Sequence, residues 1–307
     1  MLFRSLYYNP TTEEVIDYHQ GVEDLKHRVV RMIGDPRTRY REDPVRMLRA
    51  VRFAVKLNGK IDPASEEPLQ SMAGLIENVP ASRLFDEMLK LLTCGHAMDC
   101  LQRLRQDGLH QGMLPLLDVV LEQPSGAAFI ELALDRTDHR VRAEKTLSPS
   151  FLFAALLWHQ VELRWQQLLK QGETGIPALM QAADSVLDEQ TEKLAIQKRF
   201  SADMREIWFM QPRFDRRLPK SIWRMIEQPR FRAAVDFLQL RAAAGDFDSV
   251  LAQWWMDLAN ADDSGKADMI EELNKLPRDN ATGAPRARRR RRGPRAVVGQ
   301  QDAPFVE

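Results

Sequence analysis

Apolar residues recur at intervals of three and four along most of this 307-residue chain. The stretches 45–55 and 84–92 show this spacing most clearly. Such a period places the apolar side chains on one face of an α-helix. We therefore predict a mainly α-helical array in which everything after residue 21 is helix or connection. Gly- and Pro-containing breaks predict helix boundaries at 34–36, 79–80, 123–126, 147–149 and 211–212.

The first 20 residues have a different pattern. Leu6, Tyr7 and Tyr8 lead to a turn at Asn9-Pro10, and a second extended run follows at 15–18. Two short runs around a turn predict a β-hairpin. Because two strands alone are marginally stable in water, we expect the hairpin to be the remnant of a larger sheet.

The composition is that of an ordinary globular protein, with 44% hydrophobic and 29% charged residues. No apolar run approaches the roughly 20 residues of a membrane helix, and the N-terminus does not resemble a secretory signal. These features predict a cytoplasmic protein without membrane contact. Cys94 and Cys100 lack zinc-ligand spacing and are expected to be buried helix cysteines.

The net charge of zero conceals an uneven distribution. Residues 286–295 hold seven arginines and no acid, so the rest of the chain is net −7. A block of like charge stays solvated and favours a polyanionic partner, with nucleic acid the leading candidate. The alternative is a merely solubilising end. The hydrophobic pattern fades from about residue 259, which predicts a disordered C-terminus except for a short acidic helix at 267–275.

The segment 39–53 carries the strongest chemical signal. Pro44 suits the first turn of a helix, and Asp43 before it is expected to cap the exposed amides. Arg46, Arg49 and Arg52 follow in a row along one side. An Asp beside an Arg can hydrogen-bond the Watson–Crick edge of adenine or cytosine, while further arginines meet phosphate. The alternative is a solvated helix cap with ordinary salt bridges.

Several motifs carry a family resemblance. EDPVRMLRAVRF (42–53) resembles the E-D-x-x-R motif of class II nucleotidyltransferases, which include bacterial poly(A) polymerases and bacterial-type CCA-adding enzymes. Two further segments are similar to motifs of the same group: IDYHQGVEDL to the hinge motif and PASRLFDEMLKLL to the next neck motif. Three later segments resemble the poly(A) polymerase branch in particular: SPSFLFAALLW, MREIWFMQPRF and SIWRMIEQPRFRAAVDFLQLRAAAGD. The motifs occur in the family's order from Ser5 to Trp255, which makes the resemblance specific.

The resemblance implies roles for individual residues. Asp43 and Arg46 are implied to read the incoming base, and Arg49 to support them by contact with the nucleotide or the neighbouring Asp. Glu42 and Arg83 are implied to brace the neck. The implied reaction is the addition of adenylate to RNA 3′ ends, those of mRNA among them, with ATP as substrate and Mg²⁺ as cofactor.

Arginines mixed with aromatic residues predict contact with single-stranded RNA through phosphates and stacking. Trp208, Trp223 and Phe231 in these segments are nevertheless expected to be core residues, because large aromatics at helical spacing usually pack inward. The candidate RNA-binding residues are Arg213, Arg216, Arg217, Arg230 and Arg232, together with Arg288, Arg289, Arg290, Arg291 and Arg292 of the arginine block.

The family's catalytic head has a Gly-Gly loop and an Asp-x-Asp pair that holds two magnesium ions. This sequence matches only the end of a head strand motif, at residues 5–8. Its Asp246-Phe247-Asp248 follows a helical segment and is interpreted as a helix-terminal turn. We therefore predict no catalytic residue and no metal site, and an inactive fragment that lacks the head.

These observations predict four parts: a head remnant (1–20), a neck (21–115), a helical body (116–258) and an Arg-rich tail (259–307). The favoured function is that of a poly(A) polymerase. The alternatives are a non-catalytic RNA-binding module and the CCA-adding branch.

Overall fold

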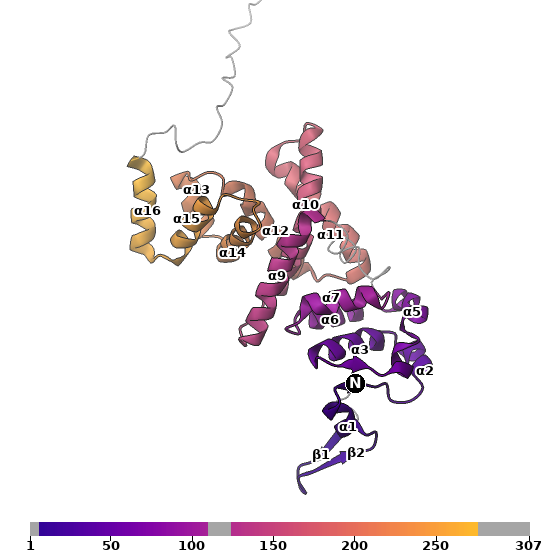
Figure 1. Cartoon of the computed structure of the whole chain (residues 1–307). Helices are drawn as coiled ribbons and strands as arrows, with labels where there is room; N and C mark the ends of the chain where they lie inside the picture. The colour runs from indigo at the N-terminus through magenta and orange to yellow at the C-terminus, as the bar shows by residue number, and fades with distance from the viewer. Residues whose placement is uncertain (1–5, 110–123, 276–307) are drawn as a thin grey trace, which may run out of the picture.

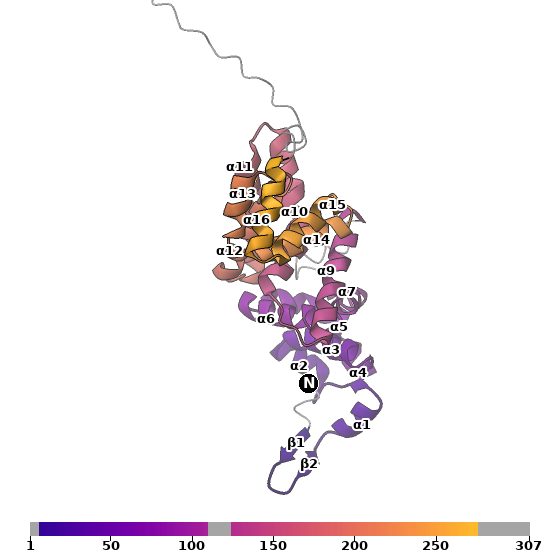
Figure 2. The same ribbon diagram turned by 90° about the vertical axis from the view of Figure 1, so that its left-hand side faces the viewer.

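The computed structural model describes residues 6–109 and 124–275, and within them it is mainly α-helical, as predicted (Figures 1 and 2). The N-terminal group comprises β1 (Leu6–Asn9), β2 (Glu14–Asp17), α1 (Gly21–Lys26), β3 (Val29–Val30), α2 (Pro36–Glu42), α3 (Val45–Lys56), β4 (Lys60–Ile61), α4 (Pro63–Glu66), α5 (Leu69–Met72), the 3-10 helix η2 (Ala73–Asn78), α6 (Ala81–Leu92) and α7 (Ala97–Gln106). The C-terminal group comprises α9 (Pro124–Arg142), α10 (Pro149–Lys170), α11 (Gly175–Leu194), α12 (Lys198–Met210), the 3-10 helix η3 (Gln211–Arg213), α13 (Pro219–Ile226), α14 (Phe231–Ala243), α15 (Ser249–Asn260) and α16 (Asp263–Lys275).

The predicted N-terminal hairpin is confirmed. Strands β1 and β2 pair antiparallel, with Leu6 opposite Asp17 and Tyr8 opposite Val15. The hairpin projects from one end of the molecule, away from the helices (Figures 1 and 2). Tyr8 and Val15 are 62% and 58% exposed, as expected of a ribbon that belongs to a larger sheet. That larger sheet stays a prediction.

The expectation that only helix follows residue 21 is wrong at one place. Strands β3 and β4 form a parallel pair, with Val29 opposite Lys60 and Val30 opposite Ile61. Gly59 permits this approach, because a Cβ there would lie 2.0 Å from the carbonyl oxygen of Arg28. Two-residue strands are too short to leave a hydrophobic period, so the sequence pattern could not reveal them.

The predicted breaks at 34–36 and 147–149 are helix starts. The Asp35 carboxylate caps α2 by accepting a hydrogen bond from the Thr38 N–H at 2.7 Å, and Pro36 occupies the first turn. The Ser148 hydroxyl caps α10 in the same way, accepting from the Phe151 N–H at 3.3 Å. Side-chain acceptors at these positions satisfy backbone donors that the helix leaves unpaired.

A continuous core joins the predicted neck to the predicted body. The ring of Phe85 in α6 stacks on Phe153 in α10 at 5.3 Å and on Phe200 in α12 at 5.9 Å between ring centroids. All three residues belong to the larger hydrophobic cluster, which also contains Leu48 of α3. The neck helices are therefore anchored on the body by buried aromatic contacts.

A second, smaller core forms among α13, α14, α15 and α16. Trp255 is fully buried at its centre, where its ring contacts Phe214 at 4.9 Å and its N–H donates to the Phe214 carbonyl at 3.0 Å. Ile270 of α16 is buried in the same core. The predicted acidic helix therefore exists but begins earlier, at Asp263, and part of the segment predicted to be disordered is folded. The arginine block lies outside the described residues.

Both cysteines are buried, as predicted, but only Cys100 lies in a helix. Cys94 lies in the turn between α6 and α7, and its Sγ is 3.5 Å from that of Cys100.

In residues 6–109 and 124–275, no helix combines the length and apolar character needed to cross a membrane.

Candidate nucleotide- and RNA-binding sites

Asp43 lies at the junction of α2 and α3. The prediction that its side chain caps the following helix is wrong, because Pro44 is the N-cap of α3 and no side-chain cap is formed. The Asp43 carboxylate instead accepts a hydrogen bond from Nη2 of Arg83 in α6 at 2.9 Å, and Nε of Arg46 lies 3.5 Å from its other oxygen. A guanidinium is a stronger donor than a neutral amide, which explains the preference.

Asp43 and Arg46 are paired but not sealed from solvent. Their side chains are 14% and 16% exposed, whereas Arg83 is half exposed. A carboxylate offers about four lone-pair sites, so Asp43 keeps acceptor capacity after binding the two arginines. Glu42 bonds Arg39 at 2.7 Å and lies 3.9 Å from Arg46. The bracing role that the resemblance implies for Glu42 and Arg83 stays a prediction.

Glu87 of α6, within the segment PASRLFDEMLKLL, is a buried anion to which the sequence analysis assigned no role. It is 1% exposed, and its two oxygens accept from Arg49 Nε at 3.0 Å and Arg52 Nη2 at 2.8 Å. Burial alone would raise the pKa of Glu87, but the hydrogen bonds from Arg49 and Arg52 hold that pKa below its ordinary value of 4.5. Arg49 is thus tied to Glu87 rather than to Asp43.

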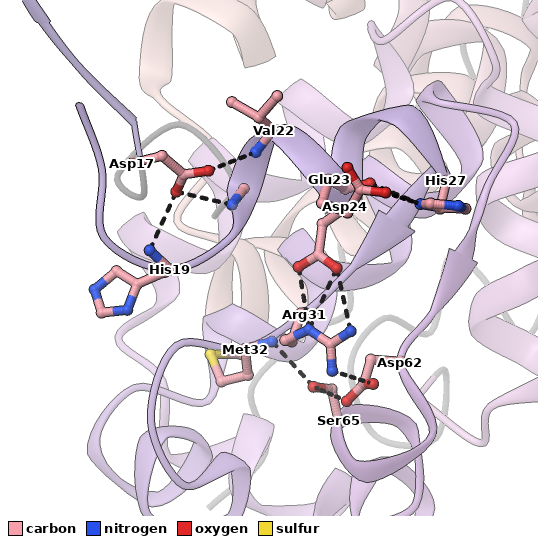
Figure 3. Close-up of polar contacts among 11 residues, drawn as sticks. Asp17, His19, Val22, Glu23, Asp24, His27, Arg31, Met32, Asp62 and Ser65 are labelled. Carbon is pink, nitrogen blue, oxygen red and sulfur yellow. Dashed lines mark hydrogen bonds and ion pairs between the residues drawn. The ribbon is translucent and has the colours of Figure 1, made fainter. Parts of the chain in front are cut away.

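The hinge motif forms a polar network at the base of the hairpin (Figure 3). The Asp17 carboxylate accepts hydrogen bonds from the N–H groups of Gly21 and Val22, both at 2.9 Å, which lower its pKa and fix the start of α1. Arg31 is held between Asp24 at 3.1 Å and Asp62 at 2.6 Å. The network joins α1 to the segment between β4 and α4, so it sets the orientation of the hairpin.

The predicted RNA-binding arginines of the body form two groups. Arg213 ends η3, and Arg216 and Arg217 follow in the turn before α13; the guanidinium of Arg217 lies 5.4 Å from the ring centre of Trp254. Arg230 and Arg232 lie at the start of α14. Arg230 pairs with Asp203 at 2.8 Å, and Arg232 pairs with Asp236 at 3.2 Å.

The aromatic residues near these arginines do not all belong to the core. Trp208 and Phe231 are buried, as predicted. Trp223 is 40% exposed, so its assignment to the core is wrong. The apolar face of α13 is filled by the buried Ile222 and Met225, and Trp223 lies beside them on the helix, outside that buried pair.

The Asp-x-Asp at 246–248 does not have the role of the magnesium-binding pair of the nucleotidyltransferase head. The Asp248 carboxylate accepts from the Leu251 N–H at 2.6 Å as the N-cap of α15, which confirms the predicted helix-terminal turn. Within the part of the chain that the structure describes, no three His, Cys, Asp or Glu side chains converge as metal ligands. No catalytic step is therefore assigned to a metal on these residues.

Comparison with known proteins identifies relatives of this chain. "Probable RNA and SrmB-binding site of polymerase A" matches residues 59–121, and "Polymerase A arginine-rich C-terminus" matches residues 171–295. Poly(A) polymerase I of Salmonella typhi is 42% identical over 302 residues, which cover 95% of this chain. The chain belongs to the poly(A) polymerase family. It spans 63% of the length of that relative.

CCA-adding enzymes are a related branch with a shorter match. The enzyme of Levilactobacillus brevis is 44% identical over 97 residues, covering 32% of this chain and 24% of its own length. The structure of the Thermotoga maritima CCA-adding enzyme complexed with tRNA has a TM-score of 0.53 and 17% identity, and it covers 82% of this chain and 57% of that one. The latter likeness shows a shared fold. The match along 95% of the chain places it with the poly(A) polymerases rather than with the CCA-adding branch.

Proposed function

We propose that this chain is the nucleotide- and RNA-recognising part of a poly(A) polymerase, an enzyme that adds adenylate from ATP to RNA 3′ ends. The observation that carries this proposal is the Asp43–Arg46 pair, which occupies the family's motif and is held by Arg83 and Glu42. The proposed substrates are ATP and the 3′ ends of cytoplasmic RNA, including mRNA.

The proposed base contacts follow from donor and acceptor chemistry. Adenine presents an amine beside a ring nitrogen that accepts. The Asp43 carboxylate accepts from the amine, and the Arg46 guanidinium donates to the ring nitrogen. Arg49, oriented by Glu87 at 3.0 Å, lies one turn further along α3 and supports the nucleotide.

The proposed RNA contacts use the body and the arginine block. Arg213, Arg216 and Arg217 supply phosphate contacts. The exposed ring of Trp223 supplies a surface on which a base can stack. Phosphoryl transfer itself requires the two magnesium ions that the family's head holds, and they stabilise the charge that develops between ATP and the RNA hydroxyl.

To test this proposal, the chain is joined to the nucleotidyltransferase head of a family member. The joined protein is then incubated with a labelled RNA oligonucleotide, ATP and Mg²⁺, and the length of the RNA is measured. The expected result is an ATP-dependent ladder that neither the head alone nor this chain alone produces. If the joined protein is folded and binds the oligonucleotide but adds no adenylate, the proposal fails, and the non-catalytic RNA-binding module takes its place.

A further inference from the structure

An open pocket of about 470 Å³ lies where α9, α10, α14 and α15 meet. Arg136, Arg140 and Arg232 contribute to its lining, and so do the apolar side chains of Phe151 and Met256. Its volume falls within the roughly 300–1,000 Å³ of typical small-ligand sites. The α9 wall and the start of α10 lie between the two segments matched by the family descriptions, whereas the α14 and α15 walls lie within the second segment, 171–295.

The arginines give the pocket a cationic wall. Arg136 and Arg140 are exposed and lie one turn apart on α9. Arg140 donates to the Thr146 carbonyl at 2.8 Å, which fixes its side chain across the loop before α10. Arg136 makes no hydrogen bond or ion pair with another residue of 6–109 or 124–275. Asp236 also lines the pocket, pairs with Arg232 at 3.2 Å and interacts electrostatically with Arg140 and Arg136, so one carboxylate faces three arginines and the pocket stays net positive.

The remaining lining suits a flat, mainly apolar group. The Phe151 ring is half-buried and packed edge-on against Phe237, with 6.1 Å between ring centroids, so it is held in place. Gln239 donates its amide to the Ala252 carbonyl at 2.7 Å, which leaves its side-chain oxygen as an acceptor. The N-terminal end of α10 also lines the pocket and adds a favourable field for an anion.

We propose that this pocket receives one unstacked nucleotide of a single-stranded RNA, with its phosphate on Arg136 and Arg140 and its base against Phe151 and Met256. The inference rests on the proposed function, because it assigns a defined contact to the RNA that the enzyme extends. Single-stranded RNA is recognised by splaying out bases, stacking them on aromatic side chains and pairing phosphates with arginines. An acidic peptide would use the arginines but would have no planar group for the aromatic wall.

The first experiment measures binding of a fluorescent 15-nucleotide oligo(A) to the full chain. The double variant Arg136→Ala/Arg140→Ala is compared with Arg142→Ala/Arg224→Ala, which removes the same charge from exposed positions outside the pocket lining. Loss of two phosphate contacts is expected to weaken binding roughly tenfold or more in the pocket variant, and only about twofold in the control. Thermal melting confirms that both variants are folded.

The second experiment maps the contact on the unaltered protein by phenylglyoxal modification of arginines and mass spectrometry. Oligo(A) is expected to protect Arg136 and Arg140 but not Arg142, while poly-glutamate of equal charge protects far less. Equal affinity of the two double variants, or equal protection by poly-glutamate, would overturn the inference. Protection by AMP but not by oligo(A) would overturn it as well, because the site would then serve a free nucleotide.

These outcomes separate the inference from the function on which it rests. If the unaltered chain does not bind oligo(A), both the RNA-binding role and the pocket are wrong. If the chain binds oligo(A) but the pocket variant matches its control, the RNA-binding role stands and only the pocket assignment fails.

Discussion

Arg83 reaches Asp43 from a different helix, so at the residue scale the proposed base-reading pair depends on a contact between the α2–α3 junction and α6. In the head-joined protein, we expect Arg83→Ala to raise the KM for ATP about fivefold, as for the loss of one hydrogen bond to a charged group, with little change in kcat. Arg83→Lys should restore most of the affinity, because an ammonium can still donate to Asp43. Steady-state kinetics with varied ATP measures both parameters. An unchanged KM in Arg83→Ala would show that Arg83 plays no part in positioning.

Trp223 is the residue at which the structure changes the functional interpretation most. Because its ring is 40% exposed, Trp223→Ala should weaken oligo(A) binding at least about fivefold through loss of stacking, and it should leave the melting temperature nearly unchanged. Leu218, which is 41% exposed, provides a matched control for loss of exposed apolar surface. Fluorescence anisotropy gives the affinities. Equal affinities for Trp223→Ala and Leu218→Ala would exclude a stacking role.

At the scale of elements, Glu87 binds α6 to α3 through Arg49 and Arg52. Because the folded-state pKa of Glu87 is held below 4.5, its contribution to stability is fully present above that pH and is lost as the pH falls toward the folded-state pKa. Glu87→Gln should therefore lower the free energy of unfolding by about 3 kcal/mol at pH 7, as for a broken buried ion pair, and by less near pH 3.5.

Urea denaturation of wild type and Glu87→Gln at both pH values checks this linkage. Glu77→Gln serves as a control, because Glu77 is exposed and its substitution should change stability little at either pH. A Glu87→Gln effect of the same size at pH 7 and at pH 3.5 would contradict the assigned ionisation.

Helix starts and buried faces were predictable from sequence because they depend on local chemistry. Asp35 and Ser148 cap helices that begin with proline, and the stripe through Leu48 is buried as its spacing indicates. The partners of Asp43 and Glu87 were not predictable, since they come from helices about 40 residues away. The exposure of Trp223 was equally hidden, because it depends on which face of a short helix the second core covers.

At the scale of the whole molecule, we propose that the arginine block at 286–295 and the body make two separable contacts with RNA. If all seven arginines of the block engage phosphates, deleting them should reduce the slope of log K against log salt by about 5. Deleting residues 296–307, which contain no arginine, should leave the slope unchanged. Oligo(A) titrations at several salt concentrations measure both slopes. Identical slopes for the two deletions would mean that the block is only a solvated end.

The central claim is that Asp43 and Arg46 choose the base that the enzyme adds. It is tested most directly by offering the head-joined protein all four nucleoside triphosphates in equal amounts and sequencing the products. The wild type is expected to add adenylate almost exclusively. Asp43→Asn replaces one acceptor oxygen with a donor amide, so it should lower the preference for adenylate at least about tenfold. If Asp43→Asn keeps the rate and the base preference of the wild type, Asp43 acts only as the salt-bridge partner of Arg46 and Arg83, and the claim is wrong.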